Sequence, residues 1–264
     1  MNIIEAIKER RSVRSFNGKP LSHENHKTLN ESIASSTDPF GGNVTIRLKE
    51  FDLKDGYKPS TYGMIKGAIN FFLLGIGSDE ASALSAGFRF EQIVLKATKM
   101  GLGTCWIAAT FKGTDFDRGE VWHNGEELKI ICPVGVPEKQ RMLEKLGRMA
   151  LGSNKRKPFE QLFFTDDFEK PLKPDSHFSE PLEMLRLAPS STNSQPWRAL
   201  VSGNTVHFYY KPKSPASVLD CGIGMCHFYL TEEYLGRKGE FFKTESAPNS
   251  PDNWKYLYSF KETE

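Results

Sequence analysis

Residues 188–197 read APSSTNSQPW, and this stretch decides the fold that we expect. Five small polar side chains stand between Pro189 and Pro196, and Trp197 closes the segment. The prolines stiffen the backbone. A rigid loop with many donors and acceptors suits a ring that carries carbonyls and nitrogens along its edge. A capped helix end followed by a turn explains the same residues, and both interpretations stay open at this point.

Part of this stretch occurs twice in the chain. Ser190-Ser191-Thr192 repeats Ser35-Ser36-Thr37 at an offset of 155, and each copy follows a predicted helix, over 26–34 and 180–188. Short strands come next. They are expected at 44–48 in the first half and at 198–201 and 206–209 in the second, where Gly203-Asn204 predicts a hairpin turn.

A second predicted helix also recurs, over 87–101 and 222–236, at an offset of 135. In the first copy Phe90, Ile93, Val94 and Ala97 share one face, and their counterparts are Met225, Phe228, Tyr229 and Glu232. Gly101 and Gly236 stand where a left-handed C-cap belongs. The smaller offset means that the first copy carries about 20 extra residues between its two helices.

Two repeats in the same order favour duplication of one unit within the chain. Residues 170–176, KPLKPDS, form a proline-broken polar stretch that we take as the boundary, with halves of 1–169 and 170–264. Each half would bury a face against the other as the subunits of a homodimer do. The expected fold class is therefore α+β, duplicated in one chain as a pseudo-dimer.

Three further segments carry candidate chemistry. In residues 10–16, RRSVRSF, the first five residues place three guanidiniums and a hydroxyl where they suit a phosphate, although basic clusters at helix ends are usually solvated surface. Residues 100–109, MGLGTCWIAA, hold two glycines that let the backbone approach a flat ligand, or that serve plain packing. Residues 154–158, NKRKP, follow PVGVP at 133–137 and form a basic run.

Composition excludes several classes of protein. The chain has 264 residues, 38% of them hydrophobic and 26% charged, which is typical of a globular protein with a real core. A formal net charge of +2 argues against nucleic acid as the main partner. The four cysteines form no CxxC pair, and His207 and His227 lack companions at metal-ligand spacing, so we expect no metal site. The N-terminus lacks a signal peptide and the most apolar stretch, 68–77, is too short for a membrane span, so we expect a cytoplasmic protein with no membrane partner.

Taken together and in this order, these segments resemble the nitroreductase family. Its pattern combines RRSxR, an APSSxNxQPW loop, GLGTCW before a pair of small residues, and PVGxP followed by a basic run with proline. The usual order places the APSS loop soon after RRSxR. Here the complete loop lies in the second half, and its first-half equivalent, residues 35–40, has lost the asparagine and QPW. That departure resembles the single-chain, duplicated branch of the family, the putative TM nitroreductases, in which the segment 220–228 is also similar to a recurring one.

The resemblance implies one FMN site shared by the two halves. The first half would supply the phosphate ligands Arg10, Arg11, Ser12, Arg14 and Arg156, with Lys155 close by. The second half would supply Pro189, Ser190, Ser191 and Asn193 to the ring. Trp106, Ile107, Ala108 and Ala109 would lie along the ring, with a backbone N–H facing its reactive nitrogen N5.

The mirror-image site is expected to be empty. Adding 155 to the positions of the phosphate ligands 10, 11, 12 and 14 leads to Thr165, Asp166, Asp167 and Glu169. A phosphate monoester carries about −1.5 to −2 charge at pH 7, so three carboxylates would repel it.

The implied activity is transfer of a hydride from NADH or NADPH through the flavin to a small acceptor such as a nitroaromatic, a quinone or an enone. The chemistry belongs to the flavin, so no side chain is named as catalytic. Residues 55–61 are expected to help wall the substrate pocket, and the chain is expected to act as a monomer. A non-catalytic FMN-binding or storage protein of the same fold is the alternative. The nearest rival enzyme is a Rossmann-type dehydrogenase with a GxG turn at 75–77, although Glu80 would then face a pyrophosphate.

Overall fold

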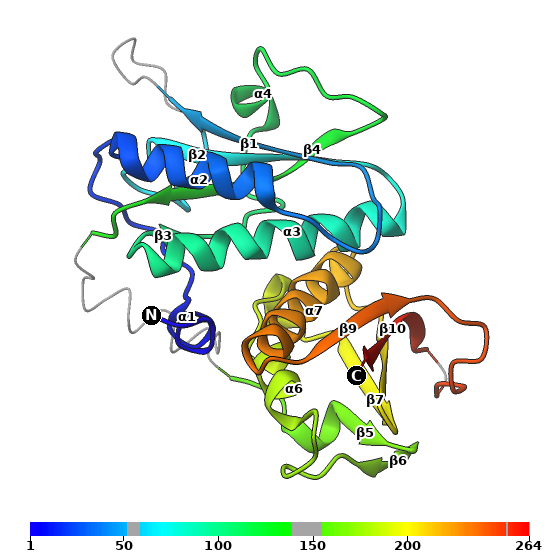
Figure 1. The fold of residues 1–264 in the computed structure, drawn as a ribbon. Coiled ribbons are helices and arrows are strands. Elements are labelled where there is room, and N and C mark those ends of the chain that lie inside the picture. Colours follow the sequence, from blue (N-terminus) through cyan, green and yellow to red (C-terminus); the bar gives the residue numbers. More distant parts are fainter. Residues whose placement is uncertain (52–58, 139–154, 252, 264) are drawn as a thin grey trace. The chain divides into compact units, whose positions relative to one another are not determined.

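The structure is a computed structural model that describes residues 1–51, 59–138, 155–251 and 253–263. It divides into two compact units, Met1–Ala150 and Leu151–Glu264. Each unit combines helices with a mostly antiparallel sheet, so the expectation of an α+β fold is confirmed. Figure 1 labels the elements.

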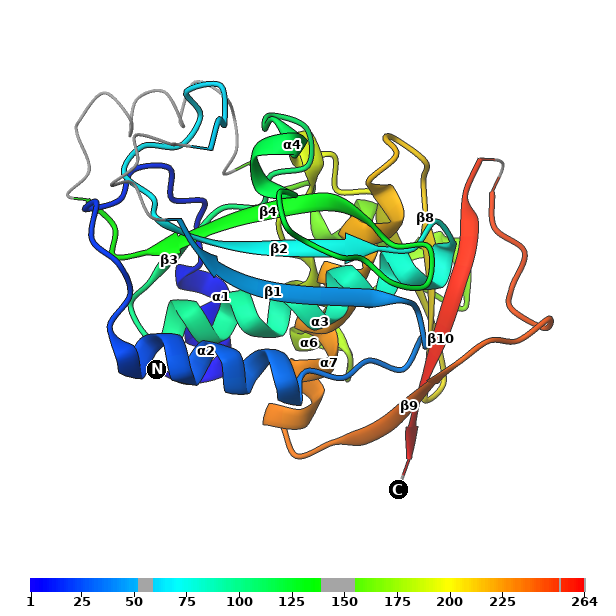
Figure 2. The ribbon, with the colours of Figure 1, turned by 90° about the horizontal axis from the view of Figure 1, so that it is seen from above.

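The first unit contains the helices α1 (Ile3–Glu9), α2 (His23–Ser35), α3 (Glu80–Lys99) and α4 (Gly113–Phe116). Its four strands are β1 (Val44–Glu50), β2 (Asn70–Ile76), β3 (Gly103–Thr104) and β4 (Glu127–Gly135), and they form one antiparallel sheet in the order β1-β2-β4-β3. Figure 2 shows these strands side by side, with α2 and α3 along the sheet.

The central strand β2 is buried along its whole length because both of its faces are covered. Phe72 packs edge-on against Phe90 of α3. Its neighbour Phe71 points to the other face and meets Phe51 and Phe116. Side chains alternate between faces at every residue of a strand, so this strand reads as a continuous apolar run. Because β2 is antiparallel to both neighbours, the Rossmann-type alternative is wrong: that fold needs parallel strands.

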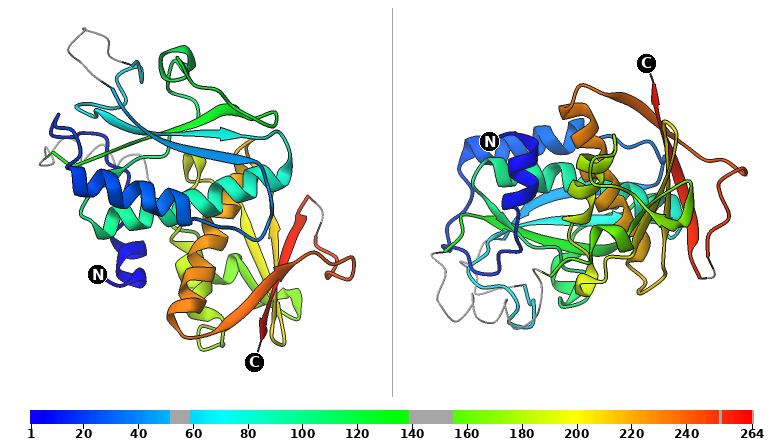
Figure 3. Two further views of the ribbon diagram at one scale, coloured as in Figure 1. Left: turned by 45° about the horizontal axis from the view of Figure 1, so that its top comes forward. Right: turned by 90° about the horizontal axis from the view of Figure 1, so that it is seen from below.

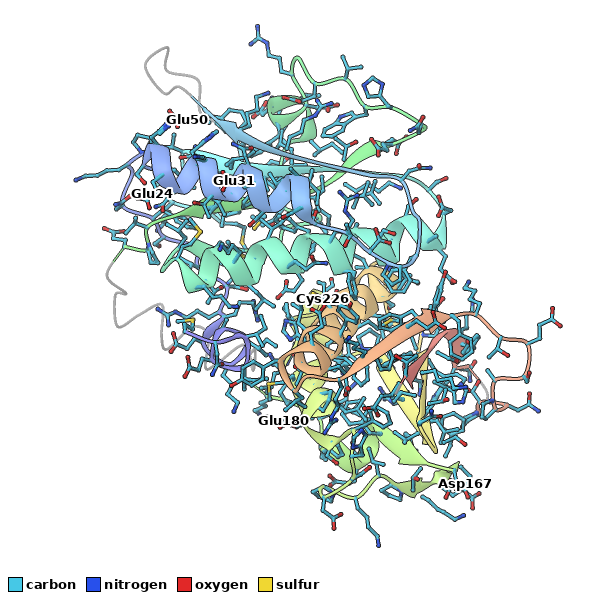
Figure 4. The ribbon with its side chains drawn as sticks, in the orientation of Figure 1. Glu24, Glu31, Glu50, Asp167, Glu180 and Cys226 are labelled. Atoms are coloured by element: carbon cyan, nitrogen blue, oxygen red, sulfur yellow. The ribbon has the colours of Figure 1, made fainter. Side chains whose placement is uncertain are left out.

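The second unit contains the helices α6 (Ser179–Arg186) and α7 (Ser217–Tyr234) and the 3₁₀ turns η1 (Phe159–Gln161) and η2 (Ser191–Asn193). Its strands are β5 (Phe163–Thr165), β6 (Asp167–Pro171), β7 (Trp197–Ser202), β8 (Thr205–Tyr210), β9 (Lys238–Phe242) and β10 (Lys255–Thr263), in the order β6-β5-β7-β8-β10-β9. Figure 3 gives two more views of these strands. In Figure 4, Asp167 is labelled on β6 and Cys226 on α7.

The two units share one order of elements. A helix, an antiparallel strand pair, a long helix and two further strands occur in the order α2-β1-β2-α3-β3-β4 and α6-β7-β8-α7-β9-β10, with the short helix α4 inserted between β3 and β4. The strand orders β1-β2-β4-β3 and β7-β8-β10-β9 also correspond. The extra residues of the first unit lie mainly between β1 and β2, where the connection runs from 51 to 69, whereas Gly203-Asn204 alone joins β7 to β8.

Both long helices end as their glycines predict. At the end of α3, Leu102 N–H donates to Ala97 O and Gly101 N–H donates to Thr98 O, with Gly101 at φ +74°. At the end of α7, Arg237 N–H donates to Glu232 O and Gly236 N–H donates to Glu233 O. This pair of bonds defines the Schellman cap. Glu232, which takes the place of Ala97, is buried and lies 3.5 Å from Arg237.

Two expectations about the repeat differ from the structure. The helix α2 ends at Ser35, whereas α6 ends at Arg186 and Ser190 follows only after a loop, so the Ser-Ser-Thr match does not join equivalent positions. The offset of 155 also mapped the arginine segment onto 165–169, which lies in β5 and β6 and follows a 3₁₀ turn rather than a helix.

The division between the units also differs from the expected boundary at 170–176. Phe163, Phe164 and Thr165 pair in parallel with Ala199, Leu200 and Val201, and β6 pairs with β5. These hydrogen bonds tie residues 163–171 to the sheet of the second unit, so the boundary falls between Ala150 and Leu151. The proline-broken stretch is instead the connection between β6 and α6.

Candidate functional site

The arginine segment of the first unit is extended chain that begins where α1 ends. Asn2 and Glu5 form a capping box that starts the helix, and Arg10 is its C-cap residue. Ser12 then forms a parallel bridge with Thr104, and Val13 N–H donates to Thr104 O over 2.8 Å. Further along, Lys66 N–H donates to Arg14 O over 2.8 Å. Backbone bonds on both sides therefore determine where the three arginines stand.

The glycine before Thr104 is required by this arrangement. A Cβ atom on Gly103 would lie 2.7 Å from Cβ of Val13, which is closer than side-chain atoms pack. Gly103 therefore lets β3 lie close to the arginine segment, rather than letting the backbone approach a flat ligand. Gly101 serves the helix cap. Both glycines of the 100–109 segment thus have a structural use, which is the second of the two interpretations that the sequence left open.

Arg10 is held by a buried carboxylate. Its Nε lies 3.9 Å from Oε1 of Glu91 on α3, and both side chains are buried. The other oxygen of Glu91 accepts a 2.9 Å hydrogen bond from Nε1 of Trp106. The charge that we expected Arg10 to offer to a phosphate is therefore partly offset by Glu91. The more available cations of the segment are Arg11, which is exposed, and Arg14, which is half-buried.

The thiol of Cys105 lies beside the same segment. Burial raises the pKa of Cys105, while the charges of Arg14 and Arg10 and a hydrogen bond with the Ser12 side chain act in the opposite direction. Residues 10, 12 and 14 alternate along extended chain and share one face. The structure therefore brings together three of the four residues expected to bind phosphate in this unit.

The segment expected along a flat ring is anchored at one end and exposed at the other. Trp106 is half-buried and packs edge-on against Phe90 at 4.7 Å. Ile107 is buried, and its N–H donates to Ile131 O over 3.0 Å. That amide is therefore engaged, and the N–H groups that can face a ligand belong to Ala108 and Ala109, which are exposed.

In the second unit, the polar loop is strained. Thr192, Asn193 and Gln195 all have left-handed backbone conformations, with φ of 51°, 55° and 48°. Such values are uncommon for residues other than glycine and are unusual for β-branched threonine. Strain of this kind concentrates at functional sites, where the surrounding structure holds it in place. Gln195 N–H donates to Oγ of Ser190 over 2.9 Å, which closes the loop on itself.

The basic run 155–157 is one of the structures that hold this loop. Asn193 Nδ2 donates to Lys155 O over 2.8 Å, and Arg156 Nη1 lies 3.3 Å from Oδ1 of Asn193. Lys157 N–H donates to Oε1 of Gln195 over 2.8 Å. We expected Lys155 and Arg156 to belong to the first half. The structure places them in the second unit, because their bonding partners are the loop residues themselves.

A buried carboxylate holds the loop from its other side. The backbone N–H of Ser191 donates to both oxygens of Asp220 on α7, at 3.0 and 3.1 Å. Burial raises the pKa of Asp220 to about 7, against the opposing effect of that amide. The sequence did not single out Asp220 as a site residue, although it stands at the start of a segment, 220–228, that resembled a family motif.

Two further cations of this unit were missed. Arg198 is buried, with 9% of its surface exposed, and its guanidinium lies 5.2 Å from the ring centre of Trp254. Burial and the neighbouring charges of Arg198, Lys213 and Lys211 lower the pKa of Lys157 to about 8. Lys157 stands in the basic run 154–158 but was not named as a ligand. The signal for Arg198 is an arginine as the second residue of an otherwise apolar strand, WRALV.

The described residues contain no group of three or more His, Cys, Asp or Glu side chains that could hold a metal ion. His227 is buried, and its Nδ1 lies 3.0 Å from Met184 O. All four cysteines are buried thiols. No described helix is both long and apolar enough to span a membrane. Of the expected pocket wall, 55–61, residues 55–58 lie outside the described residues.

The fold is similar to those of solved nitroreductase structures. The crystal structure of a putative nitroreductase from Thermotoga maritima covers 99% of this chain and 94% of its own, with 22% sequence identity and a TM-score of 0.65. Two nitroreductases with bound FMN each match only about half of this chain. The one from Desulfitobacterium hafniense has 15% identity over 53% of this chain and 92% of its own, with a TM-score of 0.45. The one from Bacteroides fragilis has 16% identity over 54% and 94%, with a TM-score of 0.41.

The fold is therefore nitroreductase-like. The profile of the family described as putative TM nitroreductase matches residues 2–232, so the chain belongs to that family. No curated protein sequence matches the chain.

Proposed function

We propose that this protein is an FMN-dependent oxidoreductase that passes a hydride from NADH or NADPH to a small electron acceptor. Membership of the family supports this proposal. The observation that carries it is the polar loop 190–195, whose strained backbone is held between the basic run 155–157 and Asp220. A preorganised loop of donors and acceptors beside fixed cations suits a ligand that joins a polar ring to a phosphate.

The chain's own residues fit such a group. In our proposal Arg10, Ser12 and Arg14, which share one face of the extended segment, bind the phosphate together with Arg156 and Lys155, and Arg11 adds its positive charge from the opposite face. Ser190, Ser191 and Asn193 bind the polar edge of the ring, and Pro189 shapes the entry to that loop. Trp106 and Ile107 position Ala108 and Ala109, whose amides face the reactive nitrogen.

Bound FMN would supply the hydride chemistry, because it accepts a hydride from a nicotinamide and passes electrons on. The protein's part is to bind and to orient. Donors fixed beside the pyrimidine edge would favour negative charge on the reduced ring, since they are already in place when that charge develops. No side chain is needed as a nucleophile or as a general base.

We further propose that the two units are duplicated copies that form a pseudo-dimer. The shared element order and the shared strand order of the two sheets support duplication. We also infer one flavin per chain, because the segment before α6 holds no counterpart of RRSxR. Asp166, Asp167 and Glu169 belong there to an edge hairpin of the sheet and carry negative charge.

The absorption spectrum of the purified protein tests the proposal. We expect a flavin spectrum with about one FMN per chain that bleaches when NADH or NADPH is added without oxygen. Flavin that is bound but that neither nucleotide reduces would indicate the alternative, a non-catalytic FMN-binding protein. If no flavin binds even in excess FMN, the proposal is wrong.

Charge reversal at Arg14 tests the phosphate site. Loss of a charge-assisted hydrogen bond costs about 1.5–3 kcal/mol, so Arg14→Glu should weaken FMN binding by about 100-fold, measured by fluorescence titration of the apoprotein. Arg118→Glu is the matched control, because Arg118 is exposed in the same unit and its described contact uses only its backbone carbonyl. Equal FMN affinity in the two variants would show that the phosphate binds elsewhere.

A further inference from the structure

Four cations of the second unit are not ligands of the proposed flavin site, although one of them, Lys157, also holds the polar loop. Arg198 is the second residue of β7, and Lys211 follows the last residue of β8. The two strands pair through Trp197 and Tyr210, and Lys211 N–H donates to Pro196 O over 2.9 Å. Lys157 belongs with them because it shares a backbone acceptor with Arg198, and Lys213 does because it stands two residues after Lys211 and its charge also acts on Lys157. We call these four residues the basic cluster.

Two members of the basic cluster share one acceptor. Nζ of Lys157 donates to Gln195 O over 3.1 Å, and Nη1 of Arg198 donates to the same oxygen over 3.3 Å. Their charged groups therefore lie within two hydrogen-bond lengths of each other. Lys157 also donates to Ser194 O over 2.7 Å, and Arg198 to Trp197 O over 2.6 Å. Carbonyl dipoles hold both groups in place, but a carbonyl carries no net negative charge.

The basic cluster has no carboxylate partner among the described residues. The described acids of this unit that form ion pairs do so elsewhere: Asp167 pairs with Lys170, Glu183 with Arg186, Glu232 with Arg237 and Glu262 with His177. Burial lowers the pKa of Arg198, opposed only in part by Cys221. Cations that are brought together and partly removed from water raise the free energy of the fold unless an anion offsets them.

The donors that remain open suit an oxyanion. The buried Nε–H of Arg198 has no acceptor among the described residues, and its two described bonds both use Nη1. Nε and Nη2 form the edge of a guanidinium that binds two oxygens of one phosphate or carboxylate. Two of the three N–H groups of Lys157 are occupied, which leaves one. Four cations with two or more free donors favour a phosphate, which carries about −1.5 to −2 charge, over a single carboxylate.

We propose that the basic cluster binds a phosphate group of the nicotinamide nucleotide, at a position separate from the FMN phosphate. This inference rests on the proposed function, because that function makes NADH or NADPH a substrate. The FMN phosphate has its own expected ligands at residues 10–14 and 155–156. The basic cluster then contributes the affinity for the second nucleotide. Both phosphate types of the donor share this chemistry: the pyrophosphate, which NADH and NADPH carry, and the 2′-phosphate, which only NADPH carries.

Equilibrium binding of NADP⁺ and NAD⁺ tests the proposal without turnover. Calorimetric titration of the FMN-loaded protein should show that Lys211→Glu/Lys213→Glu raises the Kd for NADP⁺ at least tenfold. Lys238→Glu/Lys261→Glu is the matched control. It also reverses two charges on exposed lysines of the same sheet, but Lys261 pairs with Thr205, at the opposite end of β8 from Lys211, and Lys238 lies on the neighbouring edge strand β9. Arg198→Lys keeps the charge and loses the two-donor edge, so it should also weaken binding while the protein stays folded.

Comparing NADP⁺ with NAD⁺ shows which phosphate group the basic cluster binds. A loss for NADP⁺ alone assigns the basic cluster to the 2′-phosphate, and an equal loss for NAD⁺ assigns it to the pyrophosphate; inorganic pyrophosphate should then compete. Unchanged affinity for both nucleotides in the double variant overturns the proposal. So does a loss of FMN affinity in place of nucleotide affinity.

Failure of the proposed function gives a different result. In that case no flavin is bound or reduced in the wild-type protein, whereas nucleotide binding to the flavin-free protein still depends on Lys211 and Lys213. If the proposed function holds and only this inference fails, the double variant is reduced by the same concentration of NADPH as the wild type.

Discussion

At the scale of single residues, a buried carboxylate and a half-buried lysine hold the polar loop in its strained shape. Asp220 accepts the Ser191 amide, and Lys157 donates to the carbonyls of Ser194 and Gln195. Both residues have pKa values displaced toward neutrality, Asp220 to about 7 and Lys157 to about 8. The loop is therefore held by groups whose charge responds to pH near the physiological range.

Asp220 should make the fold less stable as pH rises. In the unfolded chain its pKa is near 3.8, and in the fold it is about 7, so between those values the folded protein binds the extra proton. The contribution of Asp220 to the stability of the fold is therefore fully present below about pH 4 and is lost as pH rises through 7. A shift of this size is worth about 4 kcal/mol. Asp220→Asn cannot ionise, so its free energy of unfolding in urea should exceed that of the wild type at pH 8 by a few kcal/mol more than at pH 4.

Asp167→Asn is the control in the same unit, because the contribution of Asp167 to stability should change with pH in the opposite direction. Hydrogen bonding to Lys170 lowers the pKa of Asp167, so the contribution of this residue is present at neutral pH and is lost as pH falls through its folded pKa. A difference between wild type and Asp220→Asn that does not change with pH would show that Asp220 is not desolvated.

At the scale of elements, β3 determines where the arginine segment lies. Thr104 supplies the carbonyl that accepts Val13 N–H, and Gly103 leaves the space that Val13 fills. Val13 also belongs to the core cluster that contains Phe71 and Ile131. A change at β3 therefore reaches the proposed phosphate ligands on either side of Val13 through backbone hydrogen bonds and packing.

Gly103→Ala should disturb both stability and FMN binding. The new Cβ would lie 2.7 Å from Cβ of Val13, so the segment must move. Overpacking of this kind costs about 1–3 kcal/mol, measurable by urea unfolding, and the displaced arginines should weaken FMN affinity. Gly113→Ala, whose Cβ would meet nothing within 4 Å, is the control in the same unit. Wild-type stability and FMN affinity in Gly103→Ala would contradict this account of β3.

At the scale of the whole molecule, a single chain contains two units whose sheets share a four-strand order, β1-β2-β4-β3 and β7-β8-β10-β9. Each unit has its own sheet and its own long helix with a Schellman cap, and each has an aromatic pair between the second strand and that helix, Phe72 with Phe90 and Phe208 with Phe228. A chain that carries both copies can form the pseudo-dimer that we propose without a second subunit.

The protein should therefore be active as a monomer with one FMN. Light scattering coupled to gel filtration should give a mass near 29.8 kDa, and flavin absorbance should give about one FMN per chain. Two FMN per chain, or flavin that is lost on dilution together with a dimer, would contradict the single-chain site.

Much of the fold could be predicted from local patterns. The alternation and turn of 198–209 predicted the β7–β8 hairpin, and Gly101 and Gly236 predicted where α3 and α7 end. Hydrogen bonds between near neighbours decide these features, so nearby residues suffice to predict them. The motifs at 10–14, 100–109 and 188–197 likewise indicated the family to which the chain belongs.

Pairing between distant segments required the tertiary structure. The expected boundary at 170–176 was wrong, because β5 pairs with β7 more than 30 residues away and so belongs to the second unit. The ion pair of Arg10 with Glu91 and the hydrogen bonds of Ser191 with Asp220 and of Lys157 with Gln195 also join distant segments, so local patterns could not predict them. The sequence by itself determined the elements and the family, through local spacing. The tertiary structure decided which charges are offset and which are not, because burial and distance depend on segments that the chain brings together only when it folds.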